Sequence, residues 1–205
     1  RLNGSLAWFW YFQGHLDEGR RQLARALLLG SRSFGLHWAH VLRAAARLAV
    51  AWGDSEQATR WAEESLDIYR DVGDQRGAAF ALSTMAALAE HRGDDAEAER
   101  CYGEALVILR QIDEHLLAAF ALGNLGDVLY RRGDVKRAEA IAAEALILAQ
   151  TLGDPILTAM VLGNAAYIAI DRGDLTAAHL GFARGVREAH SGGHIPGTLD
   201  MIAGH

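Results

Sequence analysis

Apolar side chains recur every three or four residues along most of the chain, in segments of about 17 residues. In one segment Leu82, Met85, Ala86 and Ala89 lie at positions i, i+3, i+4 and i+7, which is one side of an α-helix. The same spacing recurs 40 and 80 residues later, at Leu122, Leu125, Gly126 and Leu129 and at Leu162, Ala165, Ala166 and Ala169. The pattern therefore predicts amphipathic helices, and it predicts that they repeat.

Gly-Asp pairs separate these helical segments. One series, 40 residues apart, is Gly53-Asp54, Gly93-Asp94, Gly133-Asp134 and Gly173-Asp174, and a second series half a period away is Gly73-Asp74, Asp113-Glu114 and Gly153-Asp154. Glycine after a helix adopts the left-handed conformation at little steric cost, and aspartate accepts hydrogen bonds from the first N–H groups of the next helix. One period of 40 residues is thus predicted to be two helices joined by a tight turn.

Two of these turns have an additional capping signal. Gln57 and Glu97 follow Asp54 and Asp94 by three residues, the spacing of a capping box. We therefore expect both side chains to reinforce the start of their helices.

Small residues recur where neighbouring helices would cross, at Ala46, Ala86, Gly126 and Ala166 in the first helix of each period and at Ala58, Ala98, Ala138 and Ala178 in the second. With this period, the sequence resembles the tetratricopeptide repeat family in its lengthened form. The resemblance implies an all-α fold, a right-handed α-solenoid of about five helix pairs. HEAT-type repeats have a similar length, but they usually kink the first helix with a proline, and none of the predicted helices contains one.

We expect a single domain that spans residues 1–205. The predicted helix pairs cover about residues 2–30, 37–72, 77–112, 117–152 and 157–190. Residues 194–205 are expected to form a truncated sixth repeat or a cap.

The opening stretch LAWFWYFQGHLDEGRRQLARAL, from Leu6, resembles the start of the repeat region in large bacterial ATP-dependent (STAND) transcriptional regulators of the LuxR/MalT-like and AfsR-like types. Residues 6–12 are apolar on every side of a helix, which is typical of a buried helix. We expect them to pack on an upstream domain of the same polypeptide, or to cause self-association of the isolated chain. The sequence contains no GxxxxGK[ST] phosphate loop and no DNA-recognition helix.

Composition excludes several other classes of protein. The formal charge of −6 over 205 residues argues against direct nucleic-acid binding. The single cysteine fits a reducing compartment, so we expect a cytoplasmic protein, and no apolar run approaches the roughly 18 residues of a membrane span. The histidine pairs His37/His40 and His190/His194 are weak metal signals, and Cys101 lies in a core position without an obvious basic partner. We predict no enzyme activity, no metal and no cofactor.

The family resemblance implies a concave groove lined by the first helices, which would hold a protein or peptide. Asn124 and Asn164 occupy equivalent positions one repeat apart, and in peptide-binding members such asparagines bond the backbone of an extended ligand. Gly123 and Gly163 beside them would let a ligand approach closely. The alternative is that the asparagines bond neighbouring helices and the glycines only permit tight packing.

Other residues are predicted to face the same groove. Arg43 and Arg47, one helical turn apart, are expected to bind a carboxylate or to be simply solvated. Four aromatic residues are expected either to form an apolar strip in the groove or to fill the space between successive first helices. They are Phe80, Phe120, Tyr130 and Tyr167. The remaining candidates for the groove are Asp127, Trp8 and Tyr11.

Three functions remain open from the sequence. The first is a noncatalytic protein- or peptide-binding scaffold in the sensor or interaction region of a multidomain bacterial transcriptional regulator. The second is a small-molecule effector site coupled to an ATPase module, which would use Arg43, Arg47, Trp8 and Tyr11. The third is an architectural or oligomerisation spacer whose groove binds nothing.

Overall fold

The structure is a computed structural model that describes residues 15–51 and 54–191. All regular structure in these ranges is helical, which confirms the predicted all-α class. The helices are α2 (Leu16–Leu29), η1 (Arg32–Phe34), α3 (Leu36–Ala51), α4 (Ser55–Asp71), α5 (Gln75–His91), α6 (Asp95–Gln111), α7 (His115–Arg131), α8 (Val135–Leu152), α9 (Pro155–Asp171) and α10 (Leu175–Ser191).

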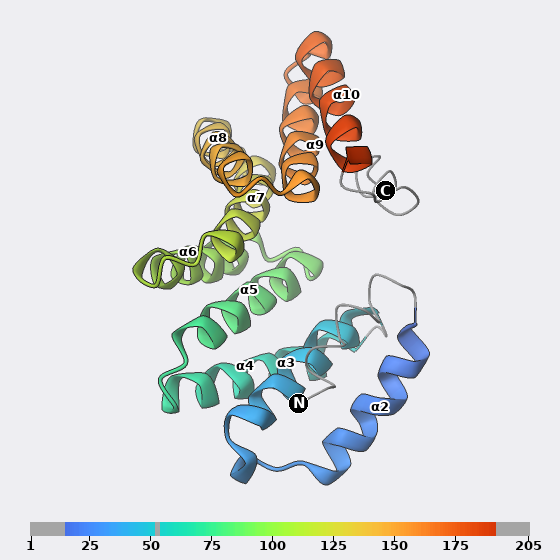
Figure 1. Ribbon diagram of the computed structural model, residues 1–205, viewed down its shortest axis with the longest axis vertical. Coiled ribbons are helices and arrows are strands. Elements are labelled where there is room, and N and C mark those ends of the chain that lie inside the picture. The colour runs from blue at the N-terminus through green and yellow to red at the C-terminus, as the bar shows by residue number, and fades with distance from the viewer. Residues whose placement is uncertain (1–14, 52–53, 192–205) are drawn as a thin grey trace. The chain divides into compact units, whose positions relative to one another are not determined.

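The chain forms two compact units, residues 1–112 and 113–205. In the first unit, α3 packs on α4 and α5 packs on α6; in the second, α7 packs on α8 and α9 on α10 (Figure 1). Successive pairs meet through α4 and α5 in one unit and through α8 and α9 in the other. The first helices also touch each other, α3 with α5 and α7 with α9, so each unit has a face made by first helices. We call this surface the first-helix face.

The predicted turn chemistry is confirmed where the structure describes it. An aspartate Oδ1 accepts a hydrogen bond from the third backbone N–H of the helix it precedes, as at Asp94, whose partner is the N–H of Glu97 at 3.1 Å. The preceding Gly93 has φ +75°, a conformation that side chains disfavour. The same aspartate contact begins helices α4, α5, α8 and α9. These five helices thus start at residues fixed by the sequence period.

The capping-box prediction is wrong in its second half. The N–H of Asp94 donates instead to the carbonyl of Ala89 in the preceding helix, at 2.9 Å. The Glu97 carboxylate therefore turns outward and accepts hydrogen bonds from Arg100 at 2.6 and 2.8 Å. Gln57 behaves in the same way and accepts from Arg60. Because the tight turn already satisfies the N–H of the capping aspartate, the side chain three residues later has no reason to reach back.

The turn between α6 and α7 departs from the Gly-Asp pattern. Asp113 stands in the place of glycine and has φ +54°, the only positive φ of a non-glycine residue in the described ranges. Glu114 precedes α7 but makes no side-chain capping bond. This turn therefore lacks both of the features that stabilise the others.

At two junctions between successive repeats an aromatic ring packs against a glycine, and the two residue types exchange places from one junction to the other. A Cβ atom built at Gly77 would lie 2.3 Å from the ring of Tyr69, which is fully buried. In the preceding repeat the sizes are exchanged: a Cβ at Gly30 would lie 2.2 Å from the ring of Trp38. Each aromatic ring therefore occupies space that only glycine leaves open, and it fixes how closely the helices approach.

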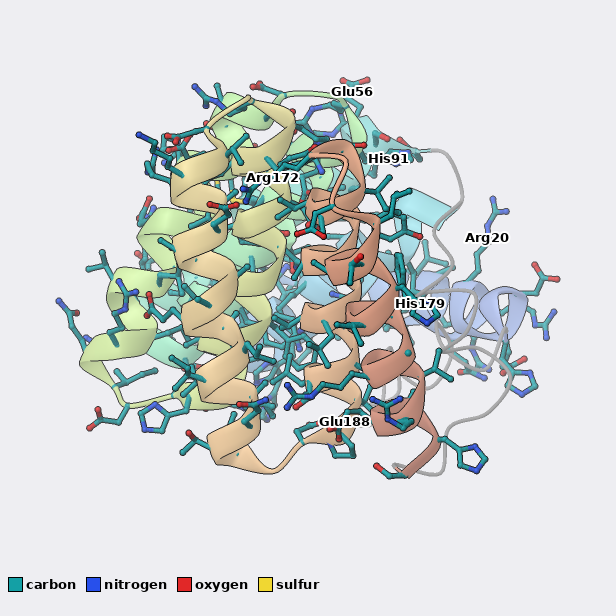
Figure 2. All side chains as sticks on the ribbon, turned by 90° about the horizontal axis from the view of Figure 1, so that it is seen from above. Arg20, Glu56, His91, Arg172, His179 and Glu188 are labelled. Carbon is teal, nitrogen blue, oxygen red and sulfur yellow. The ribbon has the colours of Figure 1, made fainter. Side chains whose placement is uncertain are left out.

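Ion pairs connect successive repeats at the surface. Arg70 pairs with Glu104 in the first unit, and Arg172 pairs with Glu139 in the second. Figure 2 labels Arg172, at the turn between α9 and α10, together with His179 and Glu188 on α10. All four paired side chains are more than one third exposed to solvent, so each pair stabilises the fold by less than about 1 kcal/mol.

Candidate functional site

The first-helix face of the first unit carries a cluster of polar and aromatic side chains. His40 Nδ1 lies 2.7 Å from the Tyr69 hydroxyl oxygen, and Arg43 Nε donates to the same oxygen at 3.4 Å. The Arg43 guanidinium also stacks on Phe80, with its Cζ 4.0 Å from the ring centroid. Helix α3 supplies His40 and Arg43, α4 supplies Tyr69, and α5 supplies Phe80. The cluster thus joins three helices.

Burial determines the charge of this cluster. Burial, followed by the positive charge of Arg43, lowers the pKa of His40 below its usual value. Burial also raises the pKa of Tyr69. At neutral pH His40 and Tyr69 are therefore uncharged, and Arg43 is the cation of the group.

The predicted arginine pair has two different environments. Arg43 and Arg47 lie one turn apart on α3, and both are half-buried. Arg43 is held by Tyr69 and Phe80, and Arg47 lies one turn further along α3. Trp8 and Tyr11, predicted to join them, lie outside the described residues, as do residues 6–12 as a whole.

On the second unit, the first-helix face is centred on Asn164. Its side-chain Nδ2 donates to Asp127 Oδ2 at 2.8 Å and, more weakly, to the Gly123 carbonyl at 3.5 Å. These bonds join α9 to α7, as the alternative interpretation of the asparagines expects. The amide oxygen of Asn164 accepts no hydrogen bond from residues 113–191, and it stays available to a ligand.

Asn124 differs from Asn164 although its position in the repeat is equivalent. It is half-buried on α7, and within residues 113–191 its side chain makes no hydrogen bond. Gly123 beside it is buried, and a Cβ there would lie 3.3 Å from Met160 Cε. Gly123 therefore serves the packing of α7 against α9, while the amide of Asn124 remains without a partner in its own unit.

The aromatic candidates of this unit contact their neighbours. Tyr130 donates its hydroxyl proton to Asp171, and this hydrogen bond raises the pKa of Tyr130. Tyr167 packs edge-on against Phe182 of α10, with ring centroids 5.1 Å apart, and it is 37% exposed. Phe120 and Phe80 are both half-buried. Tyr167 thus fills space between helices and also presents one edge to solvent.

Comparison with known proteins identifies the repeats. Residues 77–151 match the family model described as tetratricopeptide repeat, and this stretch covers helices α5 to α8. Over these residues the sequence is similar to tetratricopeptide repeats. A search of curated protein sequences found no significant match.

Solved structures extend the tetratricopeptide-repeat fold over most of the chain. BtubC (BKLC) from P. vanneervenii is 24% identical, with a TM-score of 0.73, and the match covers 93% of this chain and 80% of BtubC. A Rap protein complexed with Competence and Sporulation Factor is 19% identical, with a TM-score of 0.80 and coverage of 91% and 52%. A STAND protein with a tetratricopeptide repeat sensor from Pyrococcus horikoshii is 16% identical, with a TM-score of 0.73 and coverage of 94% and 30%. These identities show the fold alone, and this chain spans about half the length of the Rap protein and under a third of the STAND protein.

Sequence reasoning missed two members of the cluster on α3. Tyr69 belongs to a second helix, and at the equivalent positions of the next tetratricopeptide repeats stand Leu109 and Ala149. A hydroxyl group in a column of apolar residues is the signal that would have drawn attention to it. From the sequence, His40 counts as half of a histidine pair, and only the structure shows that it bonds Tyr69.

Groups that often carry catalysis or metals have ordinary environments in the described ranges. No group of three or more potential metal ligands occurs there, and His37 is exposed. Arg100 lies 3.3 Å from the Cys101 sulfur, so the thiol does have a basic neighbour. Nevertheless burial, together with the hydrogen bond to Glu97, raises the pKa of Cys101 to about 12. The thiol is therefore protonated and unreactive at neutral pH.

Two further surface properties are established for the described residues. None of their helices is long and apolar enough to cross a membrane. A depression of about 400 Å³ lies between the end of α8, the start of α9 and the second half of α10, and its lining includes Gln150, Asp154, Thr158, Arg184, Glu188 and Ser191.

Proposed function

We propose that the chain is a noncatalytic scaffold that binds an extended protein or peptide segment on its first-helix faces. The observation that carries the proposal is the pair of half-buried amides on α7 and α9, of which Asn124 lacks a partner in its unit. Within its unit, Asn124 therefore joins no two helices by a side-chain hydrogen bond. Its presence is explained if a ligand supplies the missing partner.

The geometry of Asn164 favours a backbone ligand. Its NH₂ group is bonded to Asp127, which fixes the plane of the amide and leaves Oδ1 as an acceptor. Asn124 offers a donor and an acceptor together. Peptide groups of an extended segment present N–H and C=O in alternation, so two amides one repeat apart match such a segment regardless of its side chains.

The wider role rests on resemblance and on comparison. The N-terminal stretch resembles the repeat regions of STAND regulators, and one structural neighbour is a STAND protein with a tetratricopeptide repeat sensor. Another neighbour, the Rap protein, is seen complexed with Competence and Sporulation Factor. These likenesses support a sensor or interaction region of a multidomain bacterial transcriptional regulator. The coding sequence upstream of residue 1 should then encode a GxxxxGK[ST] phosphate loop, and an upstream sequence without a nucleotide-binding module would contradict this part.

Peptide selection tests the binding function directly. Peptides selected from a random displayed library against the chain are measured by fluorescence anisotropy with the natural sequence and with Asn124→Ala/Asn164→Ala. Two lost hydrogen bonds of about 0.5–1.5 kcal/mol each should weaken binding roughly 5- to 150-fold. Gln111→Ala, an exposed amide at the end of α6, is the matched control and should change nothing. Equal affinity for the double variant and the natural chain, with both folded by circular dichroism, would refute the proposal.

A small-molecule effector site is the second candidate function. The compact cluster of His40, Arg43 and Tyr69 favours it, because three polar groups converge within adjacent repeats.

A further inference from the structure

The depression of about 400 Å³ in the second unit carries side chains of both charges. Arg184 and Glu188 of its lining come from α10, Asp154 precedes α9, and Gln150 lies near the end of α8. Its volume falls in the range of small-molecule sites. The lining therefore offers one positive charge, two negative charges and a neutral amide to a small ligand.

The two charged residues from α10 do not satisfy each other. Arg184 Nε lies 3.9 Å from Glu188 Oε1, which is longer than a hydrogen bond, and both side chains are more than one third exposed. Neither side chain makes a hydrogen bond to any residue from 113 to 191. Both groups therefore keep their hydrogen-bonding capacity for a ligand.

The order of these two charges does not stabilise α10. Within a helix, an acidic residue four positions before a basic one is the favourable order, and Arg184 and Glu188 have the reverse order. Glu188, labelled in Figure 2, also lies in the last turn of α10, where the helix dipole disfavours a negative charge. Helix stability thus does not explain this carboxylate, whereas a ligand with a positive charge would.

The part of the depression formed at the start of α9 is held by hydrogen bonds. Asp154 Oδ1 accepts from the N–H of Ile156 at 3.0 Å and from that of Leu157 at 2.9 Å. Thr158 is buried, and its hydroxyl donates to the Asp154 carbonyl at 2.8 Å. Asp154 is therefore committed to α9 and acts on a ligand through its negative charge. The side chain of Gln150, in contrast, makes no hydrogen bond to residues 113–191.

We propose that this depression binds a free α-amino acid, with the ligand's carboxylate on Arg184 and its ammonium group on Glu188. A free amino acid carries both charges at neutral pH. Both are attached to one carbon atom, so they lie side by side, as the charged groups of Arg184 and Glu188 do. Arginine binds a carboxylate through parallel hydrogen bonds, and the amide of Gln150 favours a polar ligand side chain.

Ligands with a single charge fit the lining less well. An anion would meet the negative charges of Glu188 and Asp154, and a cation would leave Arg184 without a partner. The inference goes beyond the proposed function, because none of these residues is assigned to peptide binding.

Analogues that lack one charge test this assignment. L-glutamine and L-serine carry both charges, their N-acetyl derivatives lack the ammonium group, and their carboxamides lack the carboxylate. Each compound is titrated at pH 7 into the 205-residue chain labelled with ¹⁵N-arginine, and the side-chain Nε–H signal of Arg184 is followed by NMR. This signal is assigned by its loss in Arg184→Gln.

The site predicts a saturable shift of the Arg184 signal with at least one of the two amino acids, and binding at least tenfold weaker for both of its singly charged analogues. By calorimetry, Arg184→Gln and Glu188→Gln should each weaken binding at least fivefold. Arg187→Gln, which removes an exposed arginine of the same helix outside the lining, should change it less than twofold. Because Glu188 does not stabilise α10, Glu188→Gln should leave the urea midpoint unchanged or higher.

Three results would overturn the site: no shift of Arg184 with either amino acid up to 100 mM, equal losses in the two arginine variants, or singly charged analogues that bind as tightly as the parent amino acid. Circular dichroism of each variant separates a lost site from a lost fold. Peptide binding through Asn124 and Asn164 is measured separately, so each proposal can fail without the other.

Discussion

The turn between α6 and α7 allows the turn chemistry to be tested by repair. Asp113 holds a left-handed conformation, and Glu114 makes no capping bond, where other turns have glycine and a capping aspartate. We therefore consider the double variant Asp113→Gly/Glu114→Asp, which writes the Gly-Asp sequence of the other turns into this one.

The two substitutions contribute unequally. Removing the left-handed strain of Asp113 returns about 1 kcal/mol, but glycine's greater freedom in the unfolded chain costs about 0.5–1 kcal/mol, so the first change is nearly neutral. Glu114→Asp shortens the side chain so that its oxygen can accept the N–H of Leu117, as Asp94 accepts that of Glu97, and a cap of this kind contributes about 1 kcal/mol. The double variant should be more stable by about 1 kcal/mol, nearly all of it from Glu114→Asp.

Urea denaturation followed by circular dichroism measures this gain. With a slope of about 1–3 kcal/mol/M, the midpoint should rise by roughly 0.3–1 M at unchanged slope. Asp134→Glu is the matched reversal, because it replaces a capping aspartate by the longer residue, and it should lower the free energy of unfolding by about 1 kcal/mol. If Asp134→Glu destabilises while Glu114→Asp changes nothing, the absence of a cap at Glu114 does not weaken the turn, and the reasoning is refuted.

Two other perturbations test packing and burial. Gly77→Ala should lower the free energy of unfolding by about 1–2 kcal/mol, since its Cβ would meet the Tyr69 ring at 2.3 Å. In the control variant Gly103→Ala the added Cβ would meet nothing within 4 Å, so the free energy of unfolding should rise by about 0.5–1 kcal/mol. Urea denaturation measures both variants. A Gly77→Ala variant that is more stable than the natural chain would contradict the packing of Tyr69. In the folded chain the pKa of the Cys101 thiol is raised to about 12, whereas the thiol of the unfolded chain has a pKa near 8.5. Above about pH 8.5 the unfolded chain therefore releases a proton that the folded chain keeps, and the free energy of unfolding should fall by about 1.4 kcal/mol per pH unit. Cys101→Ala should remove this part of the slope, and identical pH profiles of the two chains between pH 8.5 and 10 would show that burial does not hold the proton.

The sequence period determined most of the fold because it is a local signal. Apolar spacing predicts helices, and the Gly-Asp turn predicts where they begin, as Asp94 and Asp134 show. The capping box failed because Glu97 competes with a backbone bond from Asp94 to Ala89 that only the folded turn reveals. Gly30 and Trp38 in one pair of repeats correspond to Tyr69 and Gly77 in the next pair. A comparison of equivalent positions one at a time could not predict this exchange, because each glycine is explained only by the aromatic ring that packs against it.

The candidate site was predictable in part for the same reason. Helical spacing places Arg43 and Phe80 on first helices. Only the structure shows that the Arg43 guanidinium stacks on Phe80 while it bonds the buried Tyr69 of α4. Similarly, Asn124 and Asn164 look equivalent in sequence, but Asn164 bonds Asp127 across the α7–α9 interface, whereas the side chain of Asn124 makes no hydrogen bond within its own unit. Whether two side chains on different helices bond depends on the distance between them in the fold, and the sequence period carries no information about that distance.

The most direct test of the binding account uses the asparagines themselves. The chain has three, Asn3, Asn124 and Asn164, so selective labelling with ¹⁵N-asparagine gives three side-chain NH₂ signal pairs. On addition of a selected peptide, the account predicts that the signals of Asn124 and Asn164 shift and reach saturation together. Saturated peptide binding that leaves both of these signals unmoved would contradict it.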